Sequence, residues 1–268
     1  MRQIPILIGN TKDKAIINPI DYVEYCKKIK KIKSIRLPKY CILGFYKDMY
    51  KFIEKNFKYR KIIYHEDYPI YILKYRDVDV AFVYPTIGSS SAGSVLEELI
   101  ALGSDYFIFF GGAGTIISGI ERGRIIIPHC AIRDEGTSYH YAKPTKYAYP
   151  SKLLLKFLRE SLRKNKVNFI EGTTWTTDAP YRETIRKAKI FSKMDAIVVE
   201  MEASALFAIA RYRRKHIAGI LMAGDSIAEN RWDHRIKTEM LAKIKEERNK
   251  LLFYSLDAIS LLSKGSKQ

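Results

Sequence analysis

The fold is decided by the stretch Ala196-Ile197-Val198-Val199-Glu200-Met201-Glu202-Ala203. Its first four residues are apolar and predict a short buried strand. From residue 201 to 212 the apolar side chains recur at spacings of three and four, which predicts a helix with one buried face. Two carboxylates, Glu200 and Glu202, therefore stand at the junction between a buried strand and a helix.

The same alternation of strand and helix extends in both directions from this junction. The strand-like segments are 41–46, 68–75, 78–84, 106–110, 124–128, 169–174 and 217–222. The helix-like segments are 48–56, a helix that ends near 102, 151–166 with Ser151 as its cap, 181–191, and a helical region from 234 to the end. This order predicts a three-layer α/β protein with helices on both faces of a central mixed sheet. No linker divides the chain, so we expect one domain over residues 1–268, with 1–40 as an N-terminal extension.

The charge of the chain is strongly positive. Lys and Arg number 47 against 29 Asp and Glu, for a net charge of +18. Such a field attracts anions, including nucleic acid and phosphate. In the densest run, residues 27–33, isoleucines recur between lysines, which predicts a surface helix with a solvated basic face. We therefore expect mostly solvated surface and no dedicated nucleic-acid partner, with contact to a polyanion as the alternative.

Several classes of protein are not indicated. No stretch reaches the roughly 18 apolar residues of a membrane span. The apolar run at residues 4–8 is too short for the core of a signal peptide, so a soluble cytoplasmic protein is expected. Cys26, Cys41 and Cys130 are widely spaced, and we expect small buried side chains there, with no metal site and no cofactor.

Polar residues follow three of the predicted strands, where ligands bind in open α/β sheets. Gly111-Gly112-Ala113-Gly114 follows one of them, and such glycines either allow backbone N–H groups to approach an anion or sugar, or form a tight turn. Asp225 is either a turn residue or a proton donor for a leaving group. Glu202 either interacts with the helix dipole or accepts hydrogen bonds from two neighbouring sugar hydroxyls. The polar and aromatic segments 133–141 and 176–184 suit a pocket for a planar ring.

These residues resemble the nucleoside phosphorylase family, which includes uridine phosphorylase and the purine nucleoside phosphorylases. Residues 199–203 resemble its ribose-binding signature and are the most specific match. Residues 111–114 take the place of its glycine-rich phosphate loop, and 123–128 resemble the strand that follows. The likeness extends from about Cys41 to Ile259, with the motifs in the family's order.

The resemblance implies a role for single residues. Glu202 would bind the ribose 2′- and 3′-hydroxyls, Met201 would pack against the sugar, and Asp225 would protonate or hydrogen-bond the leaving base, as in purine-cleaving members. The further substrate-binding residues that it implies are Glu200, Tyr181, Arg182, Gly112, Ala113, Arg133 and His140. The expected reaction converts a purine or pyrimidine nucleoside and inorganic phosphate into free base and ribose 1-phosphate. A homo-oligomer, either a dimer or a hexamer, is also expected by resemblance.

The family's phosphate-binding pattern is altered in this chain. Its first motif, Gly-Asp-Pro-x-Arg, reads Gly44-Phe45-Tyr46-Lys47-Asp48, so an acid replaces the arginine. The arginine before the glycine loop is Phe109, and the threonine within the loop is Gly112. A phosphate dianion needs several charge-assisted donors, and these changes remove most of the usual ones.

Three interpretations follow for the reaction. A rebuilt phosphate site would use Ser89, Ser90 and Ser91 before a predicted helix, together with Gly44, Lys47 and Gly112. Alternatively, water is the nucleophile and the protein is a nucleosidase, with Glu135 or Glu66 as the base. In the third interpretation the protein is a non-catalytic binder of nucleosides or nucleotides.

Overall fold

The computed structural model describes residues 13–65, 68–236 and 238–265. The strands are β1 (Tyr40–Gly44), β2 (Tyr59–Ile62), β3 (Ile70–Tyr75), β4 (Val78–Val83), β5 (Tyr106–Thr115), β6 (Ile125–Asp134), β7 (Tyr147–Ala148), β8 (Phe169–Thr177), β9 (Ala196–Glu200) and β10 (His216–Ser226). The α-helices are α1 (Pro19–Ile29), α2 (Met49–Asn56), α3 (Ser89–Ala101), α4 (Lys152–Lys164), α5 (Ile185–Ser192), α6 (Ala203–Tyr212) and α7 (Leu241–Gly265). The α/β order predicted from the sequence is confirmed.

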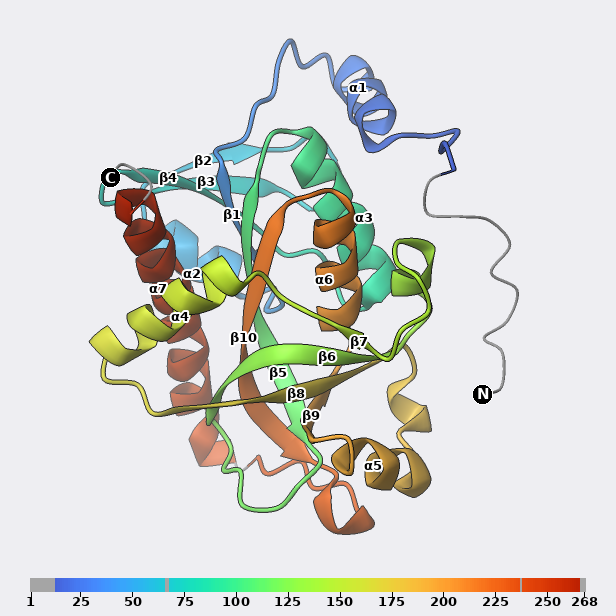
Figure 1. Cartoon of the computed structure of the whole chain (residues 1–268). Coiled ribbons are helices and arrows are strands. Elements are labelled where there is room, and N and C mark those ends of the chain that lie inside the picture. The colour runs from blue at the N-terminus through green and yellow to red at the C-terminus, as the bar shows by residue number, and fades with distance from the viewer. Residues whose placement is uncertain (1–12, 66–67, 237, 266–268) are drawn as a thin grey trace.

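All ten strands belong to one mixed sheet (Figure 1). Strand β1 pairs in parallel with both β4 and β5, whereas β2, β3 and β4 form antiparallel pairs. Strand β5 also pairs with β9 and with β10, so the path β10-β6-β8-β9-β5 returns to β10 and closes into a ring. This closure brings the ends of β5, β9 and β10 together.

Helices cover both faces of the sheet, as the three-layer prediction requires. Strand β5 shows the reason, because its apolar side chains alternate between two cores. Phe107 and Phe109 pack with residues of α1, α3 and α6, and Ile108 and Phe110 pack with residues of α2, α4 and α7. In Figure 1 the helices α3 and α6 lie on one side of β10, and α4 and α7 lie on the other.

Local signals in the sequence account for some of the helix boundaries. Ser151 caps α4 as predicted, and its hydroxyl accepts from the Leu154 N–H. The predicted helix over 181–191 is wrong at its start, since a short 3₁₀ turn (Pro180–Arg182) precedes α5. The predicted basic helix over 27–33 is also wrong in extent, because α1 ends at Ile29 and Lys31 adopts a φ of 54°.

The glycine-rich segment is strand rather than loop. β5 continues through residues 111–114, where Met222 pairs with Gly112 and Val199 pairs with Gly114. A Cβ on Gly112 would lie 3.3 Å from the Tyr46 hydroxyl, and one on Gly114 would lie 3.3 Å from Val199. The glycines are therefore explained by close packing against neighbours, and pairing with β10 and then with β9 extends the strand. Among the residues placed in the structure, no helix is long and apolar enough to cross a membrane.

Candidate functional site

A cleft of about 450 Å³ opens where β5 and β10 meet the end of β9 and the start of α6. Its walls include Gly112 and Ala113 of β5, Glu200 at the end of β9, and Met201 and Glu202 before α6. Asp225, near the end of β10, also lines it. The structure thus brings together six of the residues predicted from the sequence. The register explains this, because the last residues of β5 and β9 pair with each other.

The two carboxylates of the deciding stretch have different surroundings. Glu200 Oε2 accepts from the N–H groups of Glu202 and Ala203, each at 2.7 Å. Its Oε1 accepts from the hydroxyls of Thr176 at 2.6 Å and Thr174 at 3.2 Å. Glu200 therefore holds the start of α6 in place. Glu202 Oε1 accepts from the Gly88 N–H at 2.6 Å, so most of its accepting capacity is left for a ligand.

Gly88 fixes the position of the Glu202 carboxyl. Its φ is 103°, which a residue with a Cβ rarely adopts, and it directly precedes α3. Burial and the nearby charge of Glu200 raise the pKa of Glu202 to about 8. Burial also raises the pKa of Glu200, and its four hydrogen bonds oppose that effect. Near neutral pH the Glu202 carboxyl can therefore hold a proton. Hydrogen-bond donors of a ligand in the cleft would take the place of that proton.

Asp225 is held by the loop that follows β10. Its Oδ2 accepts from the indole N–H of Trp232 at 2.8 Å, and its main-chain oxygen accepts from Arg235 at 2.6 Å. Arg235 also donates to Ile120 and to the Thr115 hydroxyl, at 2.7 and 2.9 Å. Arg235 therefore holds the loop against β5. Trp232, which is 70% exposed, lines the cleft.

Glu183 adds a fourth carboxyl to the cleft, on the segment between the 3₁₀ turn and α5. Burial and the charge of Asp225 raise the pKa of Glu183 to about 7, and Lys187 opposes this effect. Glu183 can therefore hold a proton near neutral pH. The sequence contained this residue within a segment proposed for the pocket, but its role could not be read from spacing.

Other predicted site residues lie outside this cleft. Tyr181 is 99% exposed, and Arg182 is also exposed. His140 lines a separate pocket beside Glu97 and Glu98 of α3. Lys47 is exposed and does not line the cleft.

The predicted serine and glycine anion site does not form as expected. Ser89, Ser90 and Ser91 lie within the first turn of α3. The Ser89 hydroxyl donates to the Met201 carbonyl at 2.7 Å, and the Ser91 hydroxyl donates to the Pro85 carbonyl at 2.9 Å. Ser90 is exposed, and Gly44 is enclosed by the rings of Phe82 and Phe110. Neither these serines nor Gly44 lines the cleft.

The two residues proposed as a base for water also have other surroundings. Glu135 accepts from the Ser138 N–H and from the Ser204 hydroxyl, each at 2.8 Å. It therefore links the loop after β6 to α6 and does not line the cleft. Glu66 lies outside the described residues.

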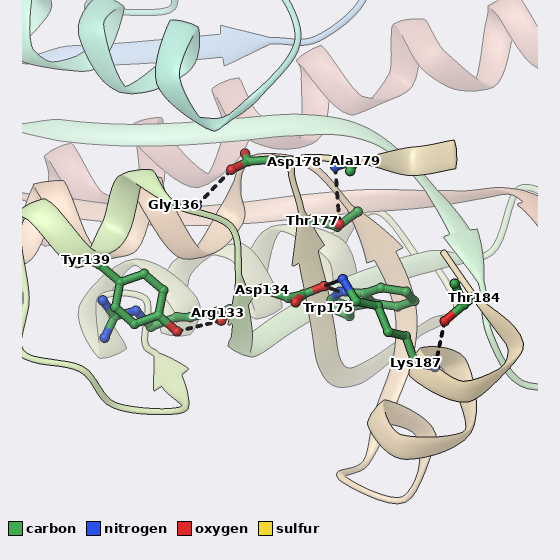
Figure 2. Close-up of polar contacts among 10 residues, drawn as sticks. All are labelled: Arg133, Asp134, Gly136, Tyr139, Trp175, Thr177, Asp178, Ala179, Thr184 and Lys187. Carbon is green, nitrogen blue, oxygen red and sulfur yellow. Dashed lines mark hydrogen bonds and ion pairs between the residues drawn. The ribbon is translucent and has the colours of Figure 1, made fainter. Parts of the chain in front are cut away.

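Arg133 is buried, and its contacts hold its own loop together (Figure 2). Its guanidinium lies 4.1 Å from the centre of the Tyr139 ring. It donates to the Ser138 hydroxyl at 2.8 Å, to the Lys143 carbonyl at 2.7 Å and to the Thr145 hydroxyl at 2.9 Å. These contacts direct it away from the cleft that contains Glu202.

Replacing Arg133 with methionine should lower the free energy of unfolding by about 2–4 kcal/mol, because several buried charge-assisted hydrogen bonds are lost together. Arg182→Met is the matched control, since that side chain is exposed, and we expect a change within about 0.5 kcal/mol. Urea denaturation of both variants measures the difference. Equal stabilities would contradict the structural role of Arg133.

The two segments expected around a planar ring are tied to each other (Figure 2). The Gly136 N–H donates to Asp178 at 2.8 Å. Asp134 accepts from the Trp175 indole at 2.9 Å and from Lys187 at 2.7 Å. These contacts fix the segment that carries Glu183 to the end of the sheet.

Several cleft residues were not identified from the sequence. They are Phe45, Tyr46, Ile87, Arg122, Pro180, Glu183, Val199, Met222, Gly224, Trp232, His234, Ile236 and Arg248, together with Gly114 of the glycine segment. The aromatic and basic composition of residues 231–236, shortly after Asp225, is the one local signal that could have found some of them. Arg122 and Arg248 come from distant parts of the chain and meet only in the fold.

The fold and the site define an α/β protein with a carboxyl-lined cleft for a small molecule. Residues 39–256 match the sequence profile of the phosphorylase superfamily. The chain belongs to this superfamily, and the family resemblance noted from its motifs is confirmed.

Individual relatives agree with this assignment. The chain is 35% identical over 122 residues to a uridine phosphorylase of Thermococcus kodakarensis. The matched segment covers 46% of this chain and 44% of that protein. The chain is 26% identical over 199 residues to a guanosine phosphorylase of Halorubrum lacusprofundi, covering 74% of this chain and 83% of that protein. The solved structure of uridine phosphorylase from Vibrio fischeri superposes with a TM-score of 0.73 at 22% identity, covering 84% of this chain and 92% of the other, and shares its fold.

Proposed function

We propose that this protein cleaves the N-glycosidic bond of a nucleoside, with inorganic phosphate as co-substrate and no other cofactor. The observation that carries the proposal is the placement of Glu202 and Asp225 in one cleft, with Glu202 held by the Gly88 N–H. The named activities of the uridine and guanosine phosphorylases above support the same class of reaction. Asp225 favours a purine as the base.

In this reaction the ribose hydroxyls donate to the Glu202 carboxylate, which positions the sugar and stabilises positive charge on it. An oxygen of phosphate forms a bond to C1′ as the bond from C1′ to the base nitrogen breaks. The electron pair of that bond goes to the base, which takes a proton at a ring nitrogen. Asp225 and Glu183 are the groups that supply this proton or stabilise it on the base by a hydrogen bond.

The pH dependence of kcat/KM should report both carboxyls. Glu183 donates only while protonated, below about pH 7, and Glu202 accepts both sugar hydroxyls only while ionised, above about pH 8. The product of these two fractions is flat between pH 7 and 8 and falls on either side. Glu183→Gln should remove only the fall at high pH, leaving a rise that levels near pH 8. An unchanged fall would exclude Glu183 as the proton donor.

A panel of purine and pyrimidine nucleosides, incubated with and without phosphate and separated by chromatography, tests the proposed function. Release of base with sugar 1-phosphate, dependent on phosphate, is the expected result. Release of base without phosphate would instead identify a nucleosidase. No release from any nucleoside would favour a non-catalytic binder and would reject the proposal.

We also propose, from the resemblance alone, a cytoplasmic homo-oligomer that acts in nucleoside metabolism such as purine salvage. Sedimentation equilibrium measures the mass of the assembly against the 31.0 kDa of one chain. A monomer at micromolar concentration would contradict the oligomer.

A further inference from the structure

Two arginines that belong to no family motif meet in the cleft. Arg122 lies in the connection from β5 to β6, and Arg248 lies on α7. The Arg248 guanidinium lies 4.5 Å from the centre of the Tyr46 ring, and Arg122 donates to the His234 carbonyl at 3.0 Å. Both line the same cleft as Glu202.

These guanidiniums lack the acidic partners that other arginines of the chain have. Arg159 pairs with Glu171 and Arg213 pairs with Glu97, each at 2.6 Å. Across the described ranges, no carboxylate forms an ion pair with Arg122 or Arg248, and the buried Nε atom of each has no hydrogen-bond partner. A buried donor without a partner costs free energy, which a bound acceptor would offset.

The positive charges also act on each other. Burial lowers the pKa of Arg122, and the nearby charges of Arg248 and Arg235 lower it further, while Asp225 opposes them. Arg235 is already engaged by its bonds to Ile120, Thr115 and Asp225. The buried Nε of Arg235 also has no partner, but Arg235 does not line the cleft. Arg122 and Arg248 are the two of these arginines that line it with donor capacity left, and a bound anion would relieve their repulsion.

A hydroxyl completes this part of the cleft. Gly112 leaves room for the Tyr46 hydroxyl, which would lie 3.3 Å from a Cβ at that position. Burial raises the pKa of Tyr46 to about 12, although both arginines oppose the shift, so the hydroxyl keeps its proton and can donate it in a hydrogen bond. The family's threonine and two arginines are replaced here by Gly112, Phe109 and Asp48. Arg122, Arg248 and the Tyr46 hydroxyl supply comparable donors from other elements.

We propose that Arg122, Arg248 and the Tyr46 hydroxyl bind a phosphate dianion inside the nucleoside cleft. The inference rests on the proposed cleavage of a nucleoside and names the residues that take its anionic group. That group is either free phosphate, which attacks C1′, or a phosphate ester carried by the nucleoside. Guanidiniums suit both, because their paired N–H groups match two phosphate oxygens.

The test measures the binding of inorganic phosphate to the whole chain, without nucleoside, by ³¹P NMR or calorimetry. We expect Arg122→Gln and Arg248→Gln each to raise the Kd at least about 10-fold, because each removes a charge-assisted contact. Tyr46→Phe keeps the ring beneath Arg248 and should raise the Kd about 3- to 10-fold, which provides a test if an arginine variant fails to fold. Arg231→Gln is the control, since Arg231 is exposed and outside the cleft, and its Kd should not change.

A parallel titration with a nucleoside and its 5′-monophosphate separates the two sources. Phosphate binding that the variants weaken identifies free phosphate. If phosphate alone does not bind, tighter binding of the monophosphate than of the nucleoside, lost in both arginine variants, identifies the ester. Binding that the variants leave unchanged, or no binding of either probe, would overturn the inference. Base release without phosphate from an unphosphorylated nucleoside would leave the proposed bond cleavage intact, so the two failures are distinguishable.

Discussion

Glu202→Gln is expected to lower kcat/KM for a nucleoside by about 100-fold while the protein stays folded. The glutamine oxygen can still accept the Gly88 N–H, so the local structure is retained. It cannot accept two sugar hydroxyls as a carboxylate does, and a hydrogen bond to a charged group contributes about 1.5–3 kcal/mol. Because the sugar becomes positive as the bond breaks, most of this loss should fall on kcat rather than on KM.

The matched control for this prediction is Glu160→Gln. Glu160 is exposed on α4 and does not line the cleft, so its kinetic constants should equal those of the unmodified protein. Steady-state kinetics and thermal unfolding of both variants give the comparison. Unchanged turnover in Glu202→Gln would remove the assignment of Glu202 to the sugar.

The sequence pattern placed Glu202 and Asp225 just after predicted strands, and the family resemblance supplied the role of each. Such positions are set by local pattern and by the general location of ligands in α/β sheets. Glu200 was predicted beside them as a substrate-binding residue, and the structure shows four protein donors around its carboxylate. Spacing identifies the junction, but the partners lie elsewhere in the chain. They are Thr174 and Thr176 of β8 for Glu200, and Gly88 for Glu202.

Long-range pairing explains where the prediction failed. Residues 111–114 have the composition of a loop, yet residues 111–113 pair with β10 and Gly114 pairs with β9. Arg133 lies in a segment rich in polar residues, but its hydrogen bonds turn it into its own loop. Arg122 and Arg248 are 126 positions apart in the sequence, and both lie among many other basic residues. Only the packing of α7 against the sheet selects these two.

Asp225→Asn is expected to reduce kcat by about 1000-fold, the largest effect among the single substitutions considered. General acid and base groups contribute factors of about 10²–10⁴. The asparagine oxygen can still accept from the Trp232 indole, so the loop after β10 should keep its position. The charge of Asp225 also raises the pKa of Glu183, and without it that pKa falls toward the ordinary value. Glu183 is then protonated in a smaller fraction of molecules at neutral pH, although burial still raises its pKa, so one substitution weakens both carboxyls.

This coupling gives the substitution a signature beyond lower activity. The low-pH limb of kcat/KM breaks near the pKa of Glu183 and should move to lower pH in Asp225→Asn, while the fall above about pH 8 stays in place. A purely structural defect would instead lower activity equally at every pH. Adding Glu183→Gln to Asp225→Asn should cost much less than Glu183→Gln alone, because the two groups act on one proton. Asp233→Asn in the same loop is the control, since its carboxylate accepts from the Arg235 N–H and an amide oxygen can do the same. Additive losses in the double variant would show that Asp225 and Glu183 act independently, and the shared role assigned to them would then be wrong.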